Sequence, residues 1–216
     1  MKTTNKITVT YEHHGGTDLA TVNSARVSFN KRSEALSDKD QKLVKYLSEH
    51  KHTSPFNHAY ATFVVKAPIV VARHLVKHEY LPWNEVSRRY VDDEPEFYVP
   101  DDLRGRATDK KQGSEGIVYI DRDLIAFANH TSLRTYNEML EAGVCPEQAR
   151  GYLPQFTMTE WWWSGTIGAW AKMCNERCHP NTQLETRIVA DQISEKMTQL
   201  FPVSWSALRG LLTPLY

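Results

Sequence analysis

The chain has 216 residues, enough for one domain with a sizeable core, and we expect a single domain over residues 1–216. Its 26 Lys and Arg residues balance its 26 Asp and Glu residues, which argues against a nucleic acid polymer as partner. No stretch approaches the roughly 20 apolar residues of a membrane span, and no apolar signal segment opens the chain. Three sparse cysteines fit a reducing compartment. We therefore expect a cytoplasmic protein that binds no membrane and holds any anionic ligand with a local cluster.

Alternation of apolar and polar residues, or bracketing by prolines, predicts three extended segments. These are residues 7–11, 60–66 and 94–100. Apolar residues at helical spacing, together with caps and breaks, predict seven helices. They cover residues 17–27, 37–50, 69–80, 117–141, 146–150, 161–176 and 182–200. Residues 101–114 are polar and charged, which predicts a surface loop. Early strands and a helix-rich second half predict an α+β fold with a small, mostly antiparallel sheet.

The densest polar cluster of the chain lies between residues 73 and 90. Its members are Arg73, His74, Lys77, His78, Glu79, Asn84, Glu85, Ser87, Arg88 and Arg89. On a helix over 69–80, positions 73, 74, 77 and 78 share one face, although the helix is otherwise apolar and should be buried. Buried charges need partners or a ligand. A phosphate suits the cations, and Glu85 and Ser87 can bond a base or sugar, but a structural ion network would explain the cluster as well.

Two further arginines, Arg150 and Arg177, stand apart from lysine-rich surface. The planar guanidinium fork suits bidentate contact with a phosphate or with a pyrimidine edge. Taken singly, each arginine is equally consistent with a cation at the surface or at a helix end. They become informative only together with the other motifs.

Six collinear motifs resemble those of the flavin-dependent thymidylate synthases. Lys77-His78-Glu79, followed after seven residues by Ser87, is similar to the family's Arg-His-Arg and Ser, with Asn84-Glu85 and Arg89-Tyr90 in the expected places. The other matches are Ala25–Ser28, His52–His58, Phe97–Pro100, Ala149–Pro154, and Arg177 with Gln183 and Glu185. The resemblance therefore spans nearly the whole chain.

The resemblance implies methylation of dUMP to dTMP by a homotetramer with FAD as cofactor, NADPH and 5,10-methylenetetrahydrofolate as co-substrates, and active sites between subunits. The positions expected around dUMP are His74, Lys77, Glu85, Ser87, Arg88, Arg89, Arg150 and Arg177. Those expected around FAD are His52, Ser54, Lys77, His78, Glu79, Glu85, Thr166, Gly168 and Lys172. Arg177 and Ser87 are the expected catalytic residues, because a fixed cation stabilises negative charge that develops on the pyrimidine. No metal is expected.

The sequence departs from the family pattern mainly on the flavin side. Lys77 and Glu79 replace the two arginines of the Arg-His-Arg, and His74 replaces a glutamine. Asn57 replaces a glutamate, and Thr166-Ile167-Gly168 stands where the family has Asn-Ala-Arg. Glu79 is expected to point away from the flavin or to pair with Lys77 or Arg88. Backbone N–H groups and Lys172 are expected to meet the flavin pyrophosphate instead of the missing arginine.

Two alternatives remain open. A metal-dependent nucleotide hydrolase would use His74 and His78, one helical turn apart, with Glu79, Glu85, His52 or His58 as further ligands, but this explains only the histidines. The second alternative is a protein of the same fold with a different activity, either a dUMP hydroxymethylase or a non-catalytic nucleotide binder. Cys174 and Cys178 are interpreted as packing residues, because nothing supplies the remaining ligands of a metal site.

Overall fold

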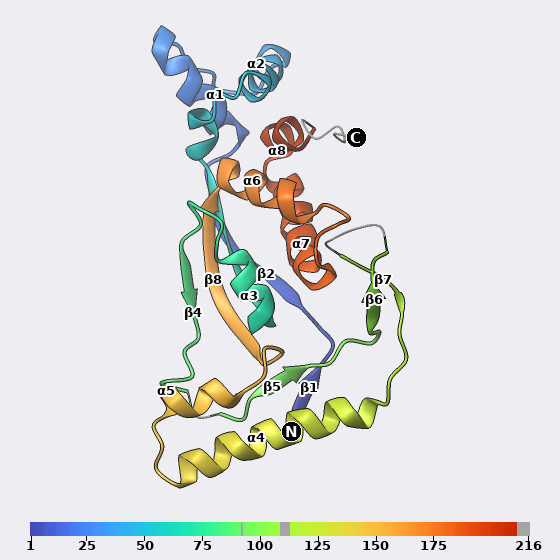
Figure 1. Ribbon diagram of the computed structural model, residues 1–216. Helices are drawn as coiled ribbons and strands as arrows, with labels where there is room; N and C mark the ends of the chain where they lie inside the picture. The colour runs from blue at the N-terminus through green and yellow to red at the C-terminus, as the bar shows by residue number, and fades with distance from the viewer. Residues whose placement is uncertain (92, 109–112, 211–216) are drawn as a thin grey trace.

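A pair of nine-residue antiparallel strands forms the centre of the structure. The computed structural model describes residues 1–91, 93–108 and 113–210 (Figure 1). Strand β3 (Tyr60–Pro68) pairs with β8 (Met158–Thr166) along its whole length. Strands β2 (Thr8–Gly15) and β4 (Trp83–Glu85) add to the two sides, which gives the order β2-β3-β8-β4. Every neighbour pair in this sheet is antiparallel, as the sequence predicted.

Two short strand pairs flank the main sheet. Strand β1 (Lys2–Thr4) runs parallel to β5 (Glu96–Tyr98), which lies in the extended segment expected around residue 97. Strands β6 (Arg104–Arg106) and β7 (Ser114–Ile117) form an antiparallel pair. The expectation of a surface loop over 101–114 is therefore wrong at residues 104–106 and at Ser114, and its residues 109–112 lie outside the described part of the chain.

Helices surround the sheet and dominate the second half of the chain. Their bounds are α1 Asp18–Arg26, α2 Asp38–Glu49, α3 Ile69–Leu75, α4 Arg122–Glu141, α5 Pro146–Ala149, α6 Ile167–Arg177, α7 Leu184–Leu200 and α8 Pro202–Arg209. Short 3-10 turns cover η1 Val27–Phe29, η2 Ser54–Asn57 and η3 Arg150–Tyr152. None of the helices in the described ranges combines the length and apolar character needed to cross a bilayer. The α+β class is confirmed.

Side-chain caps start several of these helices, and the one at Ser37 was predicted from the sequence. Ser37 and Asp40 form a reciprocal capping box at the start of α2, which satisfies two backbone N–H groups. Hydrogen bonds from Ser37, together with Arg26 and Ser33, hold the pKa of the buried Asp40 carboxyl far below its ordinary value. Thr166 caps α6 by accepting a hydrogen bond from the amide of Ala169.

One face of the main sheet forms the core. Ala61, Phe63 and Val65 of β3 are fully buried, as the period-two pattern predicted for one side of this strand. Helices α3, α6 and α7 contribute to the same cluster of buried residues. From α7 come Val189, Ile193 and Met197, which lie one helical turn apart and are all fully buried.

The largest error in the predicted elements concerns the three consecutive tryptophans. Residues 161–166 were expected to start a helix, but they belong to β8, and α6 begins only at Ile167. Trp161 and Trp163 are 1% exposed, whereas Trp162 between them is 50% exposed. Three identical apolar residues show no alternation of polar and apolar side chains, so the sequence does not reveal that every second residue is buried, as in a strand.

Several element bounds also differ from the expectation. Helix α3 ends at Leu75, not near Tyr80, where the backbone is left-handed with φ of 61°. Helix α4 begins at Arg122 with Asp121 as its cap, not at residue 117. Strand β4 and helix α8 were not predicted. Both are short, and β4 has only three residues to display a pattern.

The alternation along β8 gives a matched pair of variants. Trp163→Ala should lower the free energy of unfolding by about 3–5 kcal/mol, because it removes a fully buried ring that contacts Trp83 and Trp170. Trp162→Ala, at the neighbouring exposed position, should cost clearly less. Urea unfolding followed by circular dichroism measures both. Equal losses would contradict the strand assignment.

Candidate functional site

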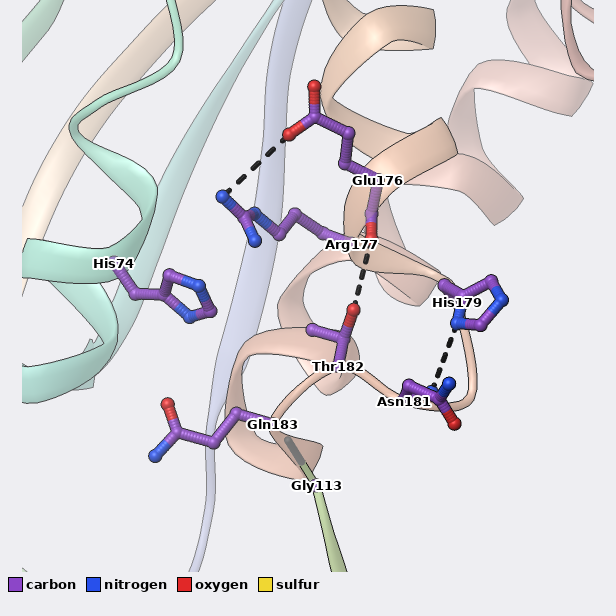
Figure 2. A pocket seen from close by; sticks show the side chains of 8 residues that line it. All are labelled: His74, Gly113, Glu176, Arg177, His179, Asn181, Thr182 and Gln183. Atoms are coloured by element: carbon purple, nitrogen blue, oxygen red, sulfur yellow. Dashed lines mark hydrogen bonds and ion pairs between the residues drawn. The ribbon is translucent and has the colours of Figure 1, made fainter. Parts of the chain in front are cut away.

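A cavity of about 400 Å³ lies where the C-terminal end of α6 meets the connection to α7 (Figure 2). Its lining residues are His74, Gly113, Glu176, Arg177, His179, Asn181, Thr182 and Gln183. Most of them follow one another along the α6–α7 connection, and His74 reaches in from α3 on the opposite side. The lining is polar and holds both a permanent cation and imidazole groups.

Arg177 is the last residue of α6 and occupies the wall of this cavity. Its Nε donates a hydrogen bond of 2.8 Å to Nε2 of His78. One terminal nitrogen lies 3.8 Å from the carboxylate of Glu176, and in Figure 2 the guanidinium points toward the His74 ring across the cavity. His78 therefore holds the cation from its Nε edge. Among the described residues no hydrogen bond occupies the terminal N–H groups, which can meet an anion or a polar ring.

His74 faces Arg177 as a neutral polar group. Its Nδ1 lies 3.0 Å from the Thr186 hydroxyl, which fixes the ring relative to α7. Burial lowers the pKa of His74 below its ordinary value, and the positive charges of Arg177 and Lys77 lower it further. A neutral imidazole at this position can donate or accept a hydrogen bond to a ligand without adding a second positive charge.

The structure corrects the argument by which the polar cluster between residues 73 and 90 was expected to bind a ligand. Because α3 ends at Leu75, Lys77 and His78 lie in the turn that follows and do not share a helix face with Arg73 and His74. Arg73 and Lys77 are exposed, so they are not the buried charges that the helix prediction required. His74 and His78 nevertheless both come close to Arg177.

The residues expected on the flavin side gather at the start of α6 and the turn after α3. Glu79 pairs with Lys172 at 3.2 Å, so the expected pairing with Lys77 or Arg88 is wrong. Both partners are largely exposed, which limits the pair to a weak contact. Lys172 comes from α6, five residues before Arg177 at the end of the same helix.

Two of the departures from the family pattern contact each other directly. The Thr166 hydroxyl donates a hydrogen bond of 2.9 Å to Oδ1 of Asn57. A Cβ atom at Gly168 would lie 2.9 Å from the same Asn57 oxygen, so this position accepts a side chain only if Asn57 moves. Ser54 opens the η2 turn that carries Asn57, and His52 lies just before it. The substitutions at 57, 166 and 168 therefore form one local arrangement.

The remaining expected residues lie elsewhere on the chain. Glu85 ends β4, and Ser87, Arg88 and Arg89 follow it. Arg150 begins η3 directly after α5, which lies at the lower left of Figure 1, away from the α6–α7 connection. Thr159 and Trp83 donate hydrogen bonds of 2.8 and 3.2 Å to Glu85. Ser87 accepts one of 3.2 Å from Arg89, and Arg88 donates to the Asp93 carbonyl at 2.9 Å. Within the described residues, no hydrogen bond or ion pair joins this group to Arg177.

A second cavity of about 360 Å³ shares Gly113 and Gln183 with the first. At its wall Arg104 of β6 binds the buried Glu185 carboxylate through contacts of 2.6 and 2.8 Å, and it donates from Nε to the Ser114 hydroxyl at 2.7 Å. This ion pair ties the β6–β7 hairpin to the start of α7. The sequence motifs included Glu185 but not Arg104. Arg104 lies in a segment that was predicted to be a loop, and its partner Glu185 is 81 residues away, so no local pattern indicates the pair.

The described residues do not supply the metal site that the hydrolase alternative requires. Among the residues with described placement, no three His, Cys, Asp or Glu side chains come together as a metal site requires. His74 and His78 do not lie one turn apart on a single helix, because α3 ends between them. The hydrolase interpretation therefore loses the geometric feature on which it rested.

Comparison with known proteins agrees with this geometry. A family model described as thymidylate synthase complementing protein matches residues 10–203. A flavin-dependent thymidylate synthase from Thermus thermophilus is 35% identical over 220 residues, covering 92% of this chain and 81% of the relative. One from Thermosipho africanus is 36% identical over 197 residues, covering 89% and 86%. The solved structure of a UMP/dUMP methylase, PolB from Streptomyces cacaoi, bound with 5-Br dUMP, has a TM-score of 0.87 at 29% identity and covers 97% of both chains.

The fold and the cavity together define an α+β protein whose polar cavity places an arginine opposite the His74 imidazole. The family match covers most of the chain, and relatives above 30% identity cover it nearly end to end. The chain therefore belongs to the thymidylate synthase complementing protein family, whose curated relatives here are named flavin-dependent thymidylate synthases.

The Arg104 pair gives a stability prediction for the wall of the site. Arg104→Met should lower the free energy of unfolding by about 3–5 kcal/mol, because it leaves the buried Glu185 carboxylate without its partner. Lys45→Met, which breaks an exposed pair with Glu49, should cost about 0–1 kcal/mol. Thermal and urea unfolding compare the two. If both variants are equally stable, the ion pair does not hold the hairpin.

Proposed function

We propose that this chain catalyses the reductive methylation of dUMP to dTMP, with FAD as cofactor and with NADPH and 5,10-methylenetetrahydrofolate as co-substrates. The observation that carries the proposal is the placement of Arg177 and His74 on two sides of one cavity, in a chain that belongs to this family. The name of the structural neighbour, a UMP/dUMP methylase bound with 5-Br dUMP, supports a uridine nucleotide as the ligand. The protein acts as one domain in the cytoplasm.

The proposed roles at dUMP divide between two parts of the chain. Arg177 polarises the pyrimidine, where a fixed cation stabilises the negative charge that develops on the ring. His74 and Lys77, from α3 and the turn after it, form the first set together with Arg177. The second set is Glu85, Ser87, Arg88, Arg89 and Arg150, with Ser87 as a further catalytic residue. Because the two sets are apart within one chain, a complete site requires the second set of another subunit.

Self-association as a homotetramer would bring these sets together. Its support is the uncovered apolar surface around the first half of α4, where Leu124 is 61% and Phe127 70% exposed. Tyr119 and Ile120, just before the helix, are 89% and 46% exposed. An apolar surface of this kind on a soluble chain marks an interface. Subunits joined through this surface would bury these side chains and fix the relative position of the two sets.

The residues proposed around FAD fit an anionic cofactor. They are His52, Ser54, Lys77, His78, Glu79, Glu85, Thr166, Gly168 and Lys172. At the start of α6, Gly168 is partly exposed beside Asn57, and Lys172 adds an exposed cation. When bound and reduced, the flavin supplies the hydride that reaches the pyrimidine. The protein residues bind it and hold it against the substrate.

A second candidate function is the same methylation reaction with UMP accepted as a substrate beside dUMP. The observation that favours it is the neighbour's own name, since PolB is a UMP/dUMP methylase with 97% of its chain covered here. Turnover of UMP beside dUMP in parallel assays would support it. Turnover of dUMP alone would restrict the enzyme to the deoxynucleotide.

Arg177→Ala tests the proposed catalytic cation. We expect dTMP formation to fall by a factor on the order of 100 to 1000, because one preorganised charge at the developing oxyanion is lost. FAD binding, measured by flavin fluorescence, should stay within about twofold. The variant should fail to support growth of a thymidine auxotroph on medium without thymidine, whereas the parent chain supports it. Near-normal turnover would remove Arg177 from the mechanism.

Glu79→Arg tests the flavin side. The change restores the family's cation and releases Lys172, so FAD should bind more tightly and the binding should depend more steeply on salt. Glu79→Gln is the matched control, since it releases Lys172 without adding a charge. A dissociation constant for FAD that is unchanged or weaker in Glu79→Arg would show that Glu79 belongs to a different local design.

A further inference from the structure

The turn after α3 is fastened to α6 at two points. Lys172 of α6 pairs with Glu79 at 3.2 Å, and Arg177, further along the same helix, donates to His78 at 2.8 Å. The Lys172 pair is exposed, so water screens it. The Arg177–His78 contact is half-buried and forms one edge of the main cavity. The Lys172–Glu79 pair does not involve Arg177, so the contact with His78 is the one that determines where the guanidinium lies.

The direction of this hydrogen bond fixes the state of the imidazole. A guanidinium has only N–H donors, so Nε2 of His78 must accept through its lone pair. That requires a neutral ring with its proton on Nδ1. A protonated His78 would present an N–H to Arg177 at the same place, and the contact would be replaced by repulsion between two cations.

The charges around His78 come from both packed helices. Arg177 and Lys172 of α6 and His74 of α3 oppose its protonation, whereas Glu176 of α6 favours it. Burial is the largest influence and lowers the pKa of His78 below the ordinary value of 6.5, and Arg177 is the next. The neutral form that the hydrogen bond requires is therefore the stable form at neutral pH.

We propose that His78 is a positioning residue that holds the Arg177 guanidinium at the cavity wall, and that it does so only with a neutral imidazole. Its importance for turnover rests on the proposed function, whereas the contact itself does not. Among the described residues, no other side chain accepts a hydrogen bond from Arg177, since Glu176 lies 3.8 Å from a terminal nitrogen of the guanidinium.

The pH dependence follows from the sign of the shift. The pKa of His78 in the folded protein is lowered, so the contact is complete above the ordinary value of 6.5 and is lost as pH falls through the folded pKa. Arg177 keeps its charge throughout this range. The substrate phosphate, whose second pKa is about 6, and His74, whose pKa is lowered as well, also change charge there. We therefore expect an acid limb in kcat, and the part that belongs to His78 is the part that His78→Gln removes.

Nitrogen NMR of the histidine rings tests the contact without any reaction. We expect His78 as the Nδ1–H tautomer at neutral pH and a titration midpoint below 6.5. Arg177→Met should raise this midpoint, and Glu176→Gln should lower it further. A His78 proton on Nε2, or a midpoint that does not respond to Arg177→Met, would overturn the proposal whatever reaction the protein catalyses.

Steady-state kinetics test the positioning role. His78→Leu should lower kcat by a factor on the order of 10 to 100, because the guanidinium loses its fixed place. His78→Gln retains an acceptor oxygen that cannot titrate, so it should recover part of kcat and lose the part of the acid limb that belongs to His78. His13→Gln is the matched control and should match the parent. If His78→Gln keeps the whole acid limb, or is no better than His78→Leu, His78 does not position Arg177.

Discussion

The pairing of β3 with β8 is the constraint on which the rest of the structure depends. The nine-residue register joins Tyr60 to Thr166 at one end and Pro68 to Met158 at the other. Each strand continues without a linker into a helix, β3 into α3 and β8 into α6. The strands are antiparallel, so the two helices start at opposite ends of the sheet. Both pack into the same core, and the turn after α3 meets the C-terminal end of α6 through the hydrogen bond between His78 and Arg177.

This arrangement explains why the cavity holds a cation beside neutral imidazoles. The core of Phe63, Trp163 and Trp170 leaves little freedom to the helices above it. Arg177 therefore emerges at a defined place, and the histidines of α3 and its following turn are half-buried against it. Burial and the arginine charge act in the same direction on both rings and lower their pKa values. The same packing thus sets the geometry and the charge state of the site.

The two ligand surfaces of the family are kept unequally in this chain. Positions proposed for dUMP retain their arginines at 88, 89, 150 and 177. On the flavin side, the cation-rich pattern is replaced by a Glu79–Lys172 pair and by the interlocked Asn57, Thr166 and Gly168. These residues contact one another, so the departures form a coherent local design rather than separate losses. Their consequence for the affinity for FAD depends on how this design meets the pyrophosphate.

Much of the fold could be predicted from local patterns, and the failures have physical causes. The capped start of α2, the buried side of β3 and the stripe of α7 follow from spacing and capping, which local sequence encodes. Strand β8 was missed at Trp161-Trp162-Trp163, because three equal side chains hide their alternation. The end of α3 was missed because no glycine or proline marks Leu75.

The candidate site was predictable as a set of residues but not as a geometry. Motif spacing selected Arg177, His74 and His78, yet the proposed reason, a shared helix face, was wrong. The contact between His78 and Arg177 joins residues 99 positions apart, and Arg104 finds Glu185 across 81. Such pairs depend on the strand register and helix directions, which no local window contains. The distance between the two sets of residues proposed around dUMP likewise depends on where β4 and α5 lie in the fold, which no local pattern encodes.

Product analysis tests the central claim most directly. Purified protein is incubated with dUMP, 5,10-methylenetetrahydrofolate, FAD and NADPH, and the nucleotide product is separated and identified by mass spectrometry. The account predicts dTMP, formed only when all four components are present. Hydroxymethyl-dUMP as the final product, or unchanged dUMP from protein that binds both FAD and dUMP, would contradict it.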